Sequence, residues 1–175
     1  MEAVAAFFTP YLNADTTSSI VRIAVAVILG MLLGIDREFR HKPAGLRSHM
    51  LVSLAAALLT ILTFKIADHA DQLGEAVRTD PLRIMEAVVA GIAFLGAGAI
   101  IRERNKVRGV TTGASLWLAG ALGVACGSGS YALAITGAVI GLFVLFVLGR
   151  MERAMAPVID AAYEREPERE PEREE

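Results

Sequence analysis

Three ionisable side chains begin a long apolar stretch of the sequence, and their spacing could support ion or proton chemistry. Asp80, Arg83 and Glu86 lie three residues apart, so they share one side of the first two turns of a helix. Carboxylate oxygens suit hard cations such as Mg²⁺, and an acid in a low-dielectric setting can have its pKa raised enough to exchange protons. The same spacing lets Arg83 neutralise both acids as a structural ion pair. The sequence leaves both interpretations open.

A second charged cluster separates the first two apolar stretches. It contains Asp36, Arg37, Glu38 and Arg47 within a segment of alternating charge, 36–49. Basic residues alone would serve as a topology signal or bind anionic lipid. Acids at the helix end favour an ion-pair network that braces two helices. The candidate metal ligands are therefore Asp36, Asp80 and Glu86, and Mg²⁺ is the ion that they would suit.

A third polar segment, 102–109, is basic and leads into an apolar stretch that carries Thr111, Thr112 and Ser115. These hydroxyls can bond carbonyls of their own helix or groups of a neighbouring helix. The basic rim also admits a phosphate-bearing ligand or a lipid headgroup.

The composition is that of an integral membrane protein. Of 175 residues, 54% are hydrophobic, 16 are Gly, and the mean hydropathy is +0.51, which exceeds the apolar content of soluble domains of this size. The single Cys126 excludes an internal disulfide, and three scattered His give no zinc or redox site. The sequence offers no nucleophile–base pair or cofactor motif, so we expect no enzyme, no cofactor other than Mg²⁺, and no nucleic-acid partner.

The apolar pattern predicts an all-α, polytopic membrane protein, a bundle of five transmembrane helices in residues 1–153. The third of these begins with Asp80 as cap and Pro81 in the first turn, and the apolar run that follows has roughly the 20 residues that a bilayer requires. Residues 154–175 form a low-complexity tail. From Glu164 the tail has no apolar residue, which predicts disorder or a fluctuating helix. The five spans are predicted at about 17–35, 48–64, 82–101, 110–126 and 131–148.

Positive charge predicts the orientation in the membrane. If the chain crosses the membrane five times, the segments 36–49 and 102–109 and the region after 148 lie on the same side. Three of the 17 Lys and Arg residues lie in the tail, and ten of the other 14 lie on that side. We therefore expect a multi-pass protein of the bacterial inner membrane, with the N-terminus outside and the C-terminus in the cytoplasm.

Small residues within the spans predict close helix packing. The glycines concerned are Gly91, Gly96, Gly98, Gly113 and Gly120, although membrane helices also tolerate Gly without such a role. Lines of small residues on more than one helix favour a homo-oligomer, most simply a dimer.

Several ordered motifs together resemble the MgtC/SapB family of bacterial inner-membrane proteins. The match covers about residues 30–152, and the motifs are Asp36-Arg37-Glu38, the segments 44–52, 80–83 and 91–100, and Arg108-Gly-Val-Thr-Thr-Gly-Ala-Ser-Leu-Trp117. The resemblance implies a role in growth at low magnesium, in survival of pathogens inside macrophages, and in restraint of the F-type ATP synthase. Direct magnesium transport is doubtful for the family. The chain resembles the short form without a C-terminal soluble domain, and Glu86 stands where an amide is commoner.

Two functions of different classes remain. The first is a regulatory membrane subunit in magnesium homeostasis. It would act through helix–helix contacts with a second copy of itself or with another membrane complex. The second is a transporter or channel for magnesium, protons or another small ion. The basic segments on one side oppose cation entry and favour the first.

Overall fold

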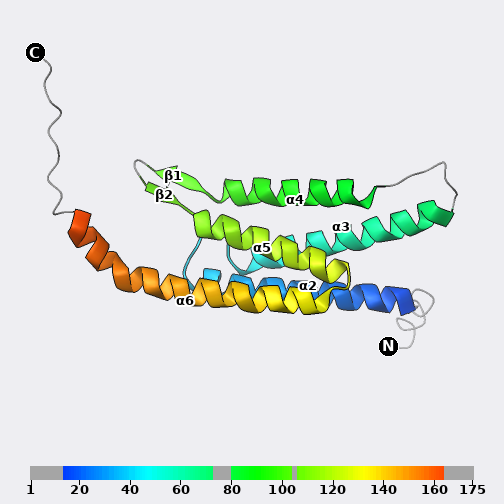
Figure 1. The fold of residues 1–175 in the computed structure, drawn as a ribbon, viewed down its shortest axis with the longest axis horizontal. Helices are drawn as coiled ribbons and strands as arrows, with labels where there is room; N and C mark the ends of the chain where they lie inside the picture. Colours follow the sequence, from blue (N-terminus) through cyan, green and yellow to red (C-terminus); the bar gives the residue numbers. More distant parts are fainter. Residues whose placement is uncertain (1–13, 73–79, 104–105, 164–175) are drawn as a thin grey trace, which may run out of the picture. The chain divides into compact units, whose positions relative to one another are not determined.

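The structure, a computed structural model, describes residues 14–72, 80–103 and 106–163. These residues form five helices and one hairpin of two short strands (Figure 1). In chain order the elements are α2 (Ala14–Phe39), α3 (Leu46–Gln72), α4 (Pro81–Gly98), β1 (Ile101–Glu103), β2 (Lys106–Arg108), α5 (Val110–Gly127) and α6 (Tyr131–Tyr163).

The all-α, polytopic membrane class is confirmed. Four helices are long and apolar enough to cross a bilayer, over Asp15–Phe39, Leu46–His69, Val110–Gly127 and Tyr131–Met151. They correspond to the predicted spans at 17–35, 48–64, 110–126 and 131–148, and the first, second and last extend beyond the predicted bounds.

The third predicted span, 82–101, is longer than the helix that forms. Asp80 caps α4 as expected, since its side chain accepts a hydrogen bond from Leu82 N at 3.0 Å with Pro81 in the first turn. However, α4 ends at Gly98, and its apolar part, Met85–Gly98, is only about 21 Å long at 1.5 Å per residue, against a bilayer core of about 30 Å.

The chain leaves α4 through a β-hairpin that the sequence did not predict. Ile101 pairs with Arg108 in an antiparallel register, so the end of the predicted span and the basic segment 102–109 are partly strand. Gly109 then adopts φ 89°, a conformation that favours glycine, and α5 starts at the next residue. The hairpin is why the helix is shorter than its apolar run.

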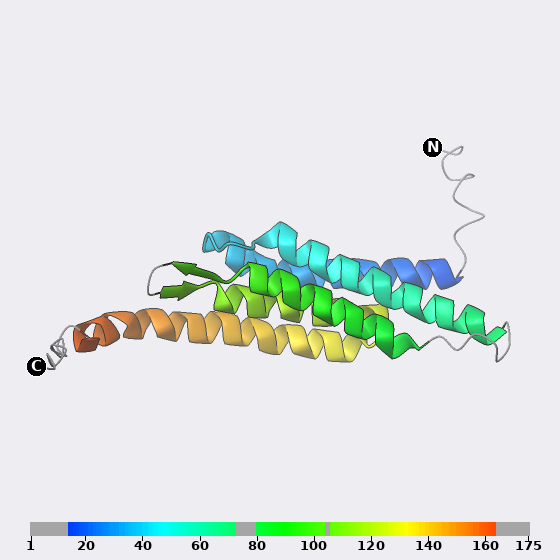
Figure 2. The same cartoon turned by 90° about the horizontal axis from the view of Figure 1, so that it is seen from above.

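Helices α2, α3 and α5 pack against one another and form the core of the bundle. Figure 2 shows α2 and α3 side by side, joined by the short turn after Phe39. Glycines permit the close approach: a Cβ at Gly30 of α2 would lie 2.7 Å from His49 O of α3, and one at Gly127 of α5 would lie 2.8 Å from Ala57 O. α3 therefore lies between two helices that present backbone to it.

Helix α4 packs on α5, and less extensively on α3. Gly96 and Gly113 face each other across the first contact, where a Cβ at Gly113 would lie 2.6 Å from Gly96 O. A Cβ at Gly120 would meet the side chain of Ile92. Three of the five glycines predicted to pack helices thus lie at helix contacts within the chain.

The other two glycines, Gly91 and Gly98 of α4, do not lie at a contact between described helices. A Cβ at either position would meet no described atom within 4 Å, and both residues are exposed. α4 turns most of its surface away from the described part of the chain, and Phe94 is 79% exposed.

Two compact units divide the chain, Met1–Leu142 and Phe143–Glu175. The first part of α6 belongs to the first unit, where a Cβ at Gly137 would lie 3.2 Å from Leu122 Cδ2. The second unit is helical to Tyr163, so helix continues past residue 153, where the low-complexity tail was predicted to begin. The segment 164–175, predicted to be disordered or a fluctuating helix, lies outside the described residues.

Candidate functional site

One acid and two bases meet at the end of the bundle that carries the hairpin, which we call the hairpin end. Asp36 and Arg37, near the end of α2, are each 4% exposed. Asp36 Oδ1 accepts a hydrogen bond from Arg40 Nε at 2.6 Å, and Asp36 Oδ2 lies 3.6 Å from Arg37 Nη2. Oδ2 makes no hydrogen bond within the described part of the chain. These three side chains, the Asp36 cluster, carry one negative and two positive charges.

Glu38 has a different position from Asp36, although both belong to the same predicted cluster. Its Oε2 accepts a hydrogen bond from Leu46 N at 3.0 Å, in the first turn of α3. The first N–H groups of a helix lack partners within the helix, so a carboxylate there caps it and complements its dipole. Gly45 leaves the space for this contact, because a Cβ there would collide with the carboxylate. Arg47 is exposed on the same turn of α3.

The sequence did not single out His49, which is fully buried beside the core contact of α2, α3 and α5. Its Nδ1 lies 2.8 Å from Gly45 O, and its Nε2 lies 3.0 Å from Ser115 Oγ of α5. The same Oγ lies 2.9 Å from Thr112 O in its own helix. The Ser115 hydroxyl thus lies within hydrogen-bond distance of both its own helix and a neighbouring one, the two alternatives left open for the hydroxyls of this segment.

His49 begins a line of buried polar side chains on α3. The others are Ser53, Thr60 and Thr63, each at most 2% exposed. Ser53 donates to Ala26 O of α2 at 2.8 Å, whereas Thr60 and Thr63 bond carbonyls one turn earlier in α3. Their spacing by three, four or seven residues marks one helical face, and this pattern could have indicated the line from the sequence.

The predicted acidic cluster of α4 lies at the opposite end of the bundle. Asp80, Arg83 and Glu86 are all exposed, and no ion pair joins them among the described side chains. The three candidate metal ligands are therefore not brought together, since Asp36 lies at the hairpin end and Asp80 and Glu86 at the other. Within the described residues, no three His, Cys, Asp or Glu side chains are grouped so that they could hold a metal ion.

Arg22 also lies at this opposite end, within the α2 span. Its Nη1 donates to Gly127 O, the last residue of α5, at 2.9 Å. A cation is favourable at the C-terminal end of a helix, where carbonyls lack partners. The basic side chain inside the first span therefore joins α2 to α5.

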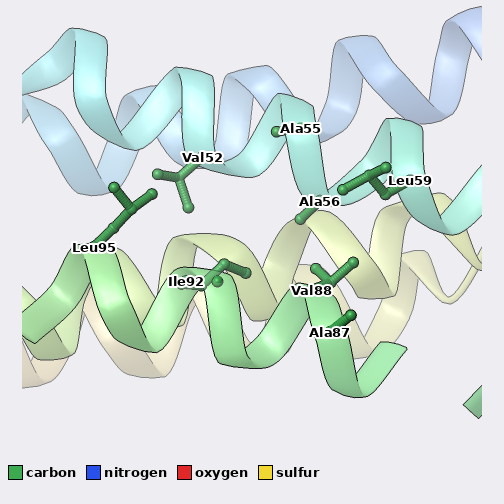
Figure 3. Close-up of a pocket in the computed structure, with 9 residues that line it drawn as sticks. Val52, Ala55, Ala56, Leu59, Ala87, Val88, Ile92 and Leu95 are labelled. Atoms are coloured by element: carbon green, nitrogen blue, oxygen red, sulfur yellow. The ribbon is translucent and has the colours of Figure 1, made fainter. Parts of the chain in front are cut away.

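A groove lies between α3 and α4 (Figure 3). It encloses about 350 Å³, and only apolar residues line it. Its lining includes the small side chains of Ala55, Ala56 and Ala87 and the larger ones of Leu59 and Leu95.

The comparison with known protein families decides the identity. The model of the MgtC family matches residues 23–154, which include the Asp36 cluster, His49 and the Gly96–Gly113 contact. The chain belongs to the MgtC family. The resemblance to MgtC/SapB proteins inferred from the motifs is thereby confirmed.

Several relatives place the chain within this family. It is 38% identical over 139 residues to the Escherichia coli K12 protein named putative magnesium transporter YhiD, covering 78% of this chain and 63% of that protein. Protein SapB of Bacillus subtilis is 35% identical over 113 residues, 64% of this chain and 48% of SapB. Protein MgtC of Brucella abortus is 40% identical over 107 residues, 61% of this chain and 41% of MgtC.

The chain spans 41% to 63% of the length of these MgtC-family relatives. No solved structure matches it.

Proposed function

We propose that this MgtC-family chain is a regulatory membrane subunit in adaptation to low magnesium, and that it acts through contacts between membrane helices. The observation that carries the proposal is the exposed face of α4. Gly91 and Gly98 have open space beside them, and the apolar groove adjoins Gly91. Small residues on an exposed membrane helix let another helix approach its backbone closely.

The charges support a regulatory role over magnesium transport. The Asp36 cluster has a net positive charge, and the nearby Arg47, Arg102 and Arg108 are exposed at the same end. A cation entering there would meet a repulsive potential. Asp80 and Glu86 lie at the opposite end, too far from Asp36 to share an ion.

Transport of a small ion is the second candidate, and the polar line on α3 favours it. His49, Ser53, Thr60 and Thr63 are buried within a membrane helix, where polar groups often mark an ion or proton pathway. The E. coli relative is named as a putative magnesium transporter.

The partners and location follow from the same proposal. The chain resides in the bacterial inner membrane with its C-terminus in the cytoplasm. It pairs with a second copy of itself or with another membrane complex, for which the F-type ATP synthase is the candidate that the family resemblance implies. The proposed role is not catalytic.

A flux assay combined with complementation tests the proposal. Purified protein in proteoliposomes, with a magnesium or a proton gradient, is expected to give the same flux as empty liposomes. In cells that need the protein for growth at low magnesium, Glu86→Gln and Asp80→Asn are expected to preserve growth at equal amounts of membrane protein. Either substitution keeps an oxygen acceptor and removes a charge. Flux above the empty-liposome control would establish the transporter instead.

A further inference from the structure

The hydrogen bonds of His49 can be counted atom by atom. Nδ1 lies 2.8 Å from Gly45 O, and a carbonyl oxygen only accepts, so Nδ1 carries a hydrogen. Nε2 lies 3.0 Å from Ser115 Oγ, and the same Oγ lies 2.9 Å from Thr112 O. The open question is where the single hydroxyl hydrogen of Ser115 resides.

Two proton arrangements fit these positions. If the Ser115 hydroxyl donates to Thr112 O, Nε2 must carry its own hydrogen and donate to Oγ, so His49 is an imidazolium. If the hydroxyl donates to Nε2 instead, the imidazole is neutral. Thr112 O then accepts only the backbone hydrogen bond within α5. The heavy atoms need not move between these states, because a hydroxyl hydrogen rotates freely.

We propose that His49, Ser115 and Thr112 form a proton-binding site that joins α3 to α5. A proton from the aqueous side binds Nε2, and the Ser115 hydroxyl turns from Nε2 to Thr112 O. No other bond is made or broken. Protonation replaces a neutral hydrogen bond between the helices with a charge-assisted one, in which His49 donates and Ser115 accepts. This inference does not rest on the proposed regulatory function.

Among the described residues, one charged side chain faces His49, and its positive charge opposes protonation of the imidazole. From α2, Gly30 and Gly34 lie against its backbone and Cβ, and Arg37 is the charged side chain that acts on the imidazole. Asp36 Oδ2, 3.6 Å from Arg37 Nη2, offsets part of that charge. α5 presents the neutral Thr112 and Ser115. On α3 itself, Arg47 is exposed.

Nuclear magnetic resonance of the full chain in lipid nanodiscs tests the site. The side-chain nitrogens of histidine report each protonation state, and the exposed His41 and His69 serve as internal references. Labelling threonine with ¹³C at the carbonyl and glycine with ¹⁵N selects the two Thr–Gly pairs of the sequence, Thr112–Gly113 and Thr136–Gly137. The second pair is the control, because Thr136 is exposed on α6.

We expect His49 to change protonation state within the pH range in which the protein stays folded. The Thr112 carbonyl signal should then move with the same midpoint as His49, and the Thr136 signal should not. The proposal is overturned if His49 keeps one protonation state throughout. It is equally overturned if His49 titrates while the Thr112 carbonyl signal stays fixed.

A pair of variants tests the role of the Ser115 hydroxyl. Ser115→Ala is expected to abolish the Thr112 response, whereas Thr111→Ala, which removes an exposed hydroxyl from the preceding turn, should leave it intact. A Thr112 response that survives Ser115→Ala contradicts the mechanism. Should Ser115→Ala not fold, the measurement on the native chain decides alone.

Discussion

The packing of α2 on α3 can be tested by adding one methyl group at Gly30. A Cβ at this position would lie 2.7 Å from His49 O and 2.9 Å from Ser53 Cβ, whereas ordinary contact begins at 3.4 Å. The first of these atoms is backbone, so a rotamer change does not relieve the clash. We expect α2 and α3 to separate by about 0.5–0.7 Å in Gly30→Ala, since interiors are closely packed.

That separation has a cost that can be bounded. Overpacking a close helix contact costs about 1–3 kcal/mol. The same shift would lengthen the bond from Ser53 Oγ to Ala26 O, now 2.8 Å, to about the limit of a hydrogen bond. Alanine recovers up to about 1 kcal/mol through its helix propensity. The net expectation is a loss of about 1–2 kcal/mol in the free energy of unfolding.

Gly91→Ala is the matched control, because it makes the same chemical change on α4, where a Cβ meets nothing within 4 Å. It should leave stability unchanged or raise it by up to about 1 kcal/mol. Equilibrium unfolding in mixed micelles, followed by circular dichroism, measures both variants. Equal unfolding free energies for Gly30→Ala and Gly91→Ala would refute the close α2–α3 contact.

Three further outcomes are expected. Glu38→Ala removes the acceptor of Leu46 N and should lower the free energy of unfolding by about 1 kcal/mol. Glu38→Gln should lose less, because an amide oxygen still accepts a hydrogen bond. Equal losses for the two variants in the same unfolding assay would contradict the cap. A reporter fused after Arg153 should be cytoplasmic and one at the N-terminus periplasmic, as reporter activity in cells will show, and finding both on one side would reject the predicted orientation. Gly98→Leu should preserve the folded monomer but weaken a dimer formed through α4, as measured by crosslinking in bilayers. Gly96→Leu should instead impair folding, because Gly113 lies against Gly96. Unchanged crosslinking with Gly98→Leu would exclude the Gly98 face of α4 as the dimer contact.

The sequence by itself determined the class of the protein and much of its local structure. Long apolar runs define four of the helices, because a bilayer core demands about 20 such residues whatever the packing. Asp80 and Pro81 start α4 as expected, since a helix cap depends only on neighbouring residues. The ordered motifs also identified the family, because sequence alone carries them.

The apolar run at residues 82–101 was the exception among the local predictions. Hydropathy does not distinguish an apolar helix from an apolar strand, and the end of this run pairs with β2 instead of completing the helix. Pairing between strands is a contact, and the apolar pattern of one segment does not contain it.

Only the tertiary structure decided which polar side chains meet. Asp36 and Glu38 are two residues apart, yet one is buried beside two arginines and the other caps α3. His49 and Ser115 are 66 positions apart and form a hydrogen bond. Such contacts depend on how each helix is rotated about its axis and where it crosses its neighbours. Those two quantities are set by the mutual packing of several helices, and no single stretch of sequence specifies them.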